Sequence, residues 1–272
     1  MPPVRTLTTI GALTIGATVL VSAHDFWLVP DAFSVAPAQE ISVRGQTSSA
    51  FPTSESAVAV DRVTSARVLG ATDEESMTAL ATREQSLLLR HRPLTAGQKR
   101  VAVTVGWRHG TETADSFRKY LVAEGADDEL TRHEAAGTLP TAAIVRRYAK
   151  YGKTVVEVGN GPRAYQRVVG HPLEFVPLSD PAEARAGSEL RVRVLFNGTP
   201  LARARFHAGM APDKSEARRK DVDLTTGDDG TAVVPLAAPG LWNVRTIHVV
   251  PAPKGADADW EVHWAALVFQ VR

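Results

Sequence analysis

Short stretches in which apolar and polar residues alternate recur through most of this chain of 272 residues. The clearest are residues 100–105 and residues 190–196, and Asn197-Gly198 directly follows the second. Alternation with a period of two places successive side chains on opposite faces of a strand. Asn-Gly between such stretches is a strong signal for a tight β-hairpin. Turn signals at short intervals are typical of antiparallel sandwiches, so the pattern predicts a mainly β fold.

The remaining segments divide into strands and a short helical region. Further strands are expected at residues 41–44, 58–60, 66–69, 87–89, 155–158, 204–208, 231–236, 242–250 and 260–271. Helices are expected at about 115–124, 127–135 and 141–150, where cap residues, Gly125 and Pro140 mark the ends. We therefore predict two β-sandwich units, immunoglobulin-like or prealbumin-like. The first covers residues 24–170 and carries a helical insertion at about 115–150, and the second covers residues 171–272.

The first 23 residues have the three parts of a signal peptide. Arg5 is their only charge, an apolar run extends from Leu7 to Val21, and Val21-Ser22-Ala23 fits the small-x-small cleavage pattern. The apolar run is shorter than the ~20 residues that a membrane-spanning helix needs. We therefore expect cleavage after Ala23, a periplasmic or secreted bacterial protein, and no stable membrane insertion after cleavage.

Composition narrows the classes of partner. The sequence contains no cysteine, which excludes a disulfide framework and a thiol nucleophile. Lys and Arg number 31 and Asp and Glu number 30, so loss of Arg5 with the signal leaves a formally neutral chain. A neutral chain lacks the basic surface by which proteins attract nucleic acid, and we expect no nucleic-acid partner.

Cleavage after Ala23 makes His24 the first residue of the mature chain. An N-terminal histidine offers its α-amine and its imidazole to the same metal ion. The α-amine has a pKa of about 8 and loses its proton to a metal more easily than a lysine does. Amine and imidazole nitrogens suit nickel(II) and copper(II). An accidental histidine at this position is the alternative interpretation.

Three other histidines lie in predicted strands and are candidate metal ligands: His248, His263 and His207. If the last two strands pair through the loop at 251–259, His248 and His263 are expected near the same end of the sheet. A hydrogen-bonded structural histidine is the competing interpretation for each of the three. The remaining histidines stand in loop-like contexts and are expected at the surface: His91, His109, His133 and His171.

The motifs of common hydrolases are absent. There is no Gly-x-Ser-x-Gly elbow, and His133-Glu134 lacks the second histidine of a zinc-protease helix. A Ser-His-Asp triad forms only in the folded protein and leaves no local signature. We therefore name no catalytic residue and expect a binding protein rather than an enzyme.

Several stretches together resemble a known family. They are Ala23-His24-Asp25-Phe26-Trp27-Leu28, residues 117–125, 147–151, 172–177 and 190–198, Trp242 to His248, and Asp259-Trp260-Glu261 with residues 264–269. The chain is similar to the domain-of-unknown-function family numbered 4198, whose members are described as periplasmic components of nickel/cobalt-type uptake systems. The resemblance implies that His24 and His248 match recurring histidines of that family, and that subunits of an inner-membrane metal transporter are partners.

The sequence leads to one expectation and two alternatives. The expectation is a periplasmic protein that binds a transition metal ion, nickel or cobalt, and hands it to a membrane transporter. One alternative is a copper-binding protein or a copper oxidase-type enzyme with an N-terminal histidine chelate. The other is a structural or adhesive β-sandwich whose histidines are incidental. The methionine-rich segment that is common in copper carriers is missing, since only Met77 and Met210 follow the signal.

Overall fold

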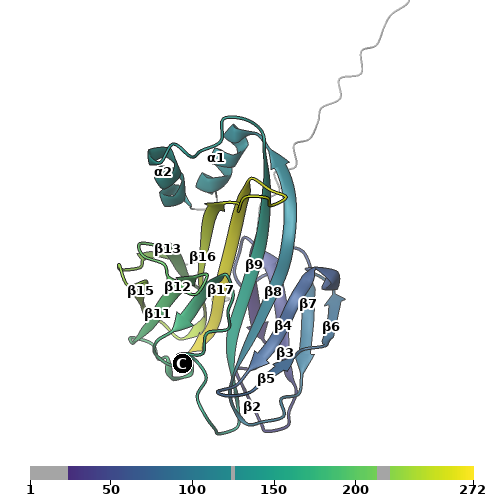
Figure 1. The fold of residues 1–272 in the computed structure, drawn as a ribbon. Coiled ribbons are helices and arrows are strands. Elements are labelled where there is room, and N and C mark those ends of the chain that lie inside the picture. Colours follow the sequence, from purple (N-terminus) through teal and green to yellow (C-terminus); the bar gives the residue numbers. More distant parts are fainter. Residues whose placement is uncertain (1–23, 124–125, 213–220) are drawn as a thin grey trace, which may run out of the picture.

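Four long strands run side by side through the middle of the molecule (Figure 1). They are, in order across the sheet, β16 (Gly240–Pro251), β17 (Trp260–Val271), β9 (Ile144–Val158) and β8 (Gly97–Glu112). β17 pairs with β9 in parallel, and the two outer pairs are antiparallel. This computed structural model describes residues 24–123, 126–212 and 221–272. The predicted signal peptide, residues 1–23, lies outside the described residues.

Shorter strands extend this long sheet on both sides. Beyond β16 lie β13 (Arg205–Met210) and β14 (Val222–Thr225). Beyond β8 lie β4 (Val63–Leu69) and β5 (Glu74–Ser76), and β2 (Ser34–Val35) pairs with the end of β9. Strands from residues 24–170 and strands from residues 171–272 thus share one sheet, in which β9 and β17 are direct neighbours.

Two smaller sheets cover opposite faces of the long sheet. The N-terminal sheet has the order β1 (Asp25–Pro30), β3 (Ile41–Ser48), β7 (Ser86–His91) and β6 (Ala79–Arg83). The C-terminal sheet contains β10 (Leu173–Pro177), β11 (Glu189–Phe196), β12 (Thr199–Pro200) and β15 (Thr231–Pro235). Each small sheet forms a sandwich with part of the long sheet, which confirms the mainly β fold with two sandwich units.

Each sandwich has its own apolar core. Phe26 and Leu28 of β1 pack with Val101 and Val103 of β8 in the first core. Phe175 of β10 packs with apolar side chains of β11, β13, β16 and β17 in the second. Gly152 of β9 allows the first core to close, because a Cβ atom there would lie 2.9 Å from side-chain atoms of both Phe26 and Leu28. The position of β1 on the long sheet therefore depends on this glycine.

Gly152→Val is expected to destabilise the protein by about 1–3 kcal/mol, the usual cost of forcing extra methyl groups into a packed core. Urea unfolding followed by tryptophan fluorescence measures this difference. Gly110→Val in β8 is the control, because no atom outside residues 109–111 lies within 4 Å of the Cβ position there. Equal unfolding midpoints for the two variants would contradict the packing argument.

The helical region is shorter than expected. α1 (Ala114–Ala123) and α2 (Asp127–Ala135) confirm the first two helices. The predicted third helix at 141–150 is wrong, because these residues lead into β9, which begins at Ile144. The helix propensity of these residues is overridden by strand pairing, because β9 forms hydrogen bonds with β8 on one side and β17 on the other. Arg146 and Lys150, expected on a solvated helix face, are buried.

The predicted turns form, and one short strand does not. Asn197 and Gly198 both have positive φ and connect β11 to β12, as the Asn-Gly signal predicted. Residues 58–60 do not form a strand, and a short 3₁₀ helix, η1 (Val60–Arg62), begins there instead. A second one, η2 (Pro181–Glu183), precedes β11. No helix in the described part of the chain is long and apolar enough to cross a membrane.

Candidate metal-binding site around His24

His24 directly precedes β1 and lies where that strand joins the long sheet. Asp25, the next residue, pairs with Ser48 of β3. The Lys150 ammonium group, from β9, donates a hydrogen bond to the carbonyl oxygen of His24. The Asp25 carboxylate forms an ion pair with Arg245 of β16 at 2.7 Å. Residues 24 and 25 are therefore held at three points: the backbone by a strand partner and by Lys150, and the Asp25 carboxylate by Arg245.

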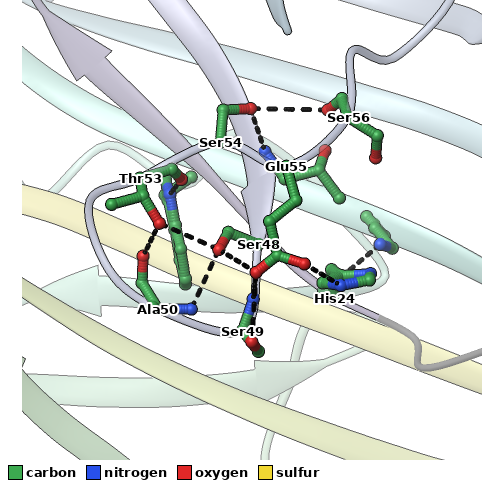
Figure 2. Close-up of polar contacts among 11 residues, drawn as sticks. His24, Ser48, Ser49, Ala50, Thr53, Ser54, Glu55 and Ser56 are labelled. Carbon is green, nitrogen blue, oxygen red and sulfur yellow. Dashed lines mark hydrogen bonds and ion pairs between the residues drawn. The ribbon is translucent and has the colours of Figure 1, made fainter.

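The imidazole of His24 is fixed by a carboxylate. Its Nε2 lies 2.7 Å from Oε2 of Glu55, which comes from the loop after β3 (Figure 2). An ionised carboxylate only accepts hydrogen bonds, so Nε2 carries the proton. Nδ1 of the neutral ring then keeps its lone pair. Nδ1 is also the ring nitrogen nearer to the backbone, on the same residue as the α-amine that cleavage after Ala23 would create.

A second carboxylate–histidine pair lies on the same face of the long sheet. His207 of β13 is 2.7 Å from Asp223 through its Nδ1, and it pairs with Arg245 in the sheet register. Arg245 also contacts Asp221 at 2.6 Å, in addition to Asp25. Burial raises the pKa of Asp25, while the nearby Arg245 guanidinium opposes that shift. The Arg245 guanidinium and its two carboxylate partners, Asp25 and Asp221, therefore lie between His24 and His207.

The four predicted metal ligands divide between the two faces of the sheet. Lys150, which contacts His24, is followed by Tyr151, whose side chain points to the other face and contacts His263. His263 pairs directly with His248 across β17 and β16. Cross-strand partners share a face, so His248 lies with His263. The structure thus groups His24 with His207 and His248 with His263, and it does not bring all four together.

His248 and His263 are buried and hydrogen-bonded, near the same sheet end as predicted. His248 Nδ1 lies 2.6 Å from Glu129 of α2. His263 Nδ1 lies 3.0 Å from the Tyr151 hydroxyl, and its Nε2 lies 3.3 Å from Glu261. Burial lowers the pKa of each of the two histidines to about 4. They are therefore neutral at physiological pH, held between the long sheet and the end of β11.

Side chains alone do not assemble a metal site in the part of the chain that the structure describes. No three His, Asp or Glu residues are grouped there closely enough to hold an ion. A chelate formed by the α-amine and the Nδ1 of one terminal histidine requires no such group. His24 is the predicted ligand whose surroundings fit this chelate, because Glu55 occupies the other ring nitrogen.

Ser48, Glu55 and His24 are not arranged as a Ser-His-Asp triad. Ser48 lies beside Glu55 and donates its hydroxyl proton to the carboxylate at 2.6 Å. A Ser-His-Asp arrangement instead needs the serine hydroxyl on the histidine ring, with the carboxylate behind the ring. The order here is serine, glutamate, histidine, so Ser48 and His24 both contact the carboxylate, and the carboxylate does not lie behind the ring as it does in a triad.

Two expectations about surface histidines are wrong, and two site residues had no sequence signal. His171 and His133 are buried, although loop-like neighbours suggested exposure. Neither ring nitrogen of His171 has a hydrogen-bond partner, and burial lowers its pKa to about 3. Glu55 is one acidic residue in a Ser/Thr-rich loop, and Lys150 stood in the predicted third helix. Only the fold brings these two to His24.

Comparison with known proteins identifies a family, and the solved structures named below are similar to this chain only at low TM-scores. No curated protein sequence matches the chain. The Yersinia pseudotuberculosis adhesin InvE is 12% identical, with a TM-score of 0.24, over 91% of this chain and 60% of that one. The chain thus spans less than two thirds of InvE. The D0-D1 domain of intimin is also 12% identical, with a TM-score of 0.22, over 89% of this chain and 96% of that one. The family model "Domain of unknown function (DUF4198)" matches residues 21–250, and the chain therefore belongs to this family.

Proposed function

We propose that this protein is an exported periplasmic metal-binding protein that captures nickel or cobalt through His24 and delivers it to a membrane uptake system. The ligands are the α-amine and Nδ1 of His24. One observation carries the proposal: Glu55 binds Nε2 of His24 and leaves Nδ1 for the metal. Histidines that bind metals commonly donate their other ring N–H to a carboxylate in this way.

Two further features support the proposal. Lys150 already holds the carbonyl oxygen of His24, and Arg245 holds the carboxylate of Asp25, so binding orders little additional chain. The family match begins at residue 21, next to the predicted cleavage site. The choice of nickel or cobalt over copper, and the delivery to a transporter, rest on the family resemblance. His248 and His263 lie on the other face of the sheet, so the proposal does not depend on them.

The test is the intact mass and the metal content of protein exported to a bacterial periplasm. We expect a mass that corresponds to residues 24–272 and one equivalent of metal after incubation with nickel(II) or cobalt(II). Affinity is expected to fall as the pH is lowered from about 8 to 5, because protons compete for the amine and the imidazole. Copper(II) is titrated in parallel. Correctly cleaved protein that binds none of the three ions would overturn the proposal.

A further inference from the structure

The loop after β3 is folded around one carboxylate. The side chain of Glu55 is 47% exposed, yet it accepts hydrogen bonds from the Ser48 hydroxyl at 2.6 Å and from the Ser49 backbone N–H and hydroxyl at 3.2 and 3.1 Å (Figure 2). His24 is its fourth donor. An exposed glutamate ordinarily samples several rotamers. Here three donors from the loop hold Oε1 and leave Oε2 directed at the imidazole.

The loop itself is tied to the neighbouring strands. The Glu55 backbone N–H donates to the Thr47 carbonyl oxygen at 2.8 Å. The Thr47 N–H in turn donates to the Ser54 hydroxyl at 3.1 Å, and that hydroxyl donates to the carbonyl oxygen of Gln85 at 2.5 Å. The carboxylate is therefore held at a fixed place relative to the start of β1. It does not depend on a metal ion to bring it there.

The fixed carboxylate also selects one tautomer of the His24 ring. The Ser48 hydroxyl and the Ser49 N–H hold its Oε1, and its Oε2 lies 2.7 Å from Nε2 of His24. An acceptor fixed at Nε2 selects the tautomer with its proton on Nε2. The alternative tautomer has its proton on Nδ1, the nitrogen that the chelate requires.

We propose that Glu55 is a positioning residue of the His24 metal site, and that it acts by selecting the Nε2–H tautomer and fixing the orientation of the ring. This inference rests on the proposed function, because it assigns Glu55 a role in the same chelate. Glu55 does not touch the metal. It removes the need for the ring to rotate and change tautomer when the ion arrives. The serine-rich loop is the structure that keeps Glu55 in place.

The experiment uses the chain 24–272 and its Glu55→Ala variant. Long-range ¹H–¹⁵N correlation spectra of the metal-free proteins report the tautomer of His24. We expect the Nε2–H tautomer in the wild type and a mixture of both tautomers in Glu55→Ala. Calorimetric titration with nickel(II) is expected to show a loss of about 10–100-fold in affinity, the usual effect of removing such a partner. Ser48→Ala keeps the carboxylate but removes one of the hydrogen bonds that hold it. Its nickel affinity is expected to lie between those of the wild type and Glu55→Ala.

The control is a matched pair elsewhere in the chain. His91 Nε2 lies 3.1 Å from Glu75 in the N-terminal sandwich, so Glu75→Ala removes the same kind of contact from a histidine that has no free amine. Glu75→Ala is expected to leave nickel affinity unchanged. Wild type that binds no nickel overturns the proposed function and this role together. Wild type that binds, with a Glu55→Ala variant that binds equally well and keeps the tautomer, overturns the role of Glu55 alone.

Discussion

A chain with one extra residue before His24 is expected to bind nickel(II) or cobalt(II) at least about 10-fold more weakly than the chain that begins at His24. The extra residue deletes no side chain. It converts the α-amine into a peptide nitrogen, whose lone pair is delocalised into the carbonyl group. One of the two proposed ligands is thereby lost. The loss of a direct ligand is expected to cost at least as much as the 10–100-fold that loss of a ligand's partner costs.

The measurement is calorimetric titration of the extended chain, the chain 24–272, and the His24→Ala variant of the latter. His24→Ala keeps an amine and loses the imidazole, so it is expected to show a loss of similar size. His91→Ala serves as the control, because His91 also has a carboxylate partner but lies within the chain. If the extended chain binds as tightly as the wild type, the amine is not a ligand and His24 has no special role at its position.

Acid is expected to unfold this protein cooperatively, with a steep loss of stability between about pH 6.5 and 4. His171, His248 and His263 are buried between the long sheet and the C-terminal sheet, and burial lowers their pKa values to about 3, 4 and 4. The unfolded chain takes up these protons near pH 6.5, while the folded protein does not. The unfolded state therefore binds more protons below pH 6.5, and stability falls as the pH is lowered. Above pH 6.5 these groups contribute no pH dependence.

The expected loss of stability is calculated from about 1.4 kcal/mol for each unit by which a pKa differs between the folded and unfolded states. A histidine whose pKa is lowered from 6.5 in the unfolded chain to about 4 in the folded protein reduces the free energy of unfolding by about 3 kcal/mol by pH 4. The summed loss from three such histidines is of the order of the whole free energy of unfolding of an ordinary domain. Thermal unfolding followed by circular dichroism at a series of pH values between about 8 and 4 measures the loss.

His171→Leu isolates the contribution of one of these histidines. Because neither ring nitrogen of His171 has a partner, leucine removes no hydrogen bond and is expected to leave stability at pH 7 nearly unchanged or higher. The loss of stability toward acid is expected to become smaller by a few kcal/mol. His109→Gln, at a histidine whose side chain is 43% exposed, is expected to leave the slope unchanged. An unchanged acid slope in His171→Leu would contradict the burial argument.

The sequence alone was sufficient for features that depend on neighbouring residues. Strand periodicity, the Asn197-Gly198 turn and the first two helices are all local patterns, and the structure has each of them. The position of His248 and His263 near the same end of the sheet was also expected from the sequence, because a single short loop joins their strands. The prediction that His24 is a metal ligand also rests on a local pattern, the small residues that precede it, and it stays a prediction.

The tertiary structure decided whatever depends on two segments that are far apart in the chain. Residues 144–150 carry helix-compatible alanine, arginine and lysine, but they form a strand because β8 and β17 supply hydrogen bonds on both sides. The face on which each histidine lies depends on register, since a shift of one residue reverses every side chain. His248 and His263 share one face of the long sheet, whereas β1 packs over Gly152 on the other face, and this separates His24 from His248. Glu55 and Lys150 reach His24 from 31 and 126 residues away, and only the packing of β1 on the long sheet brings them to the imidazole and the carbonyl oxygen.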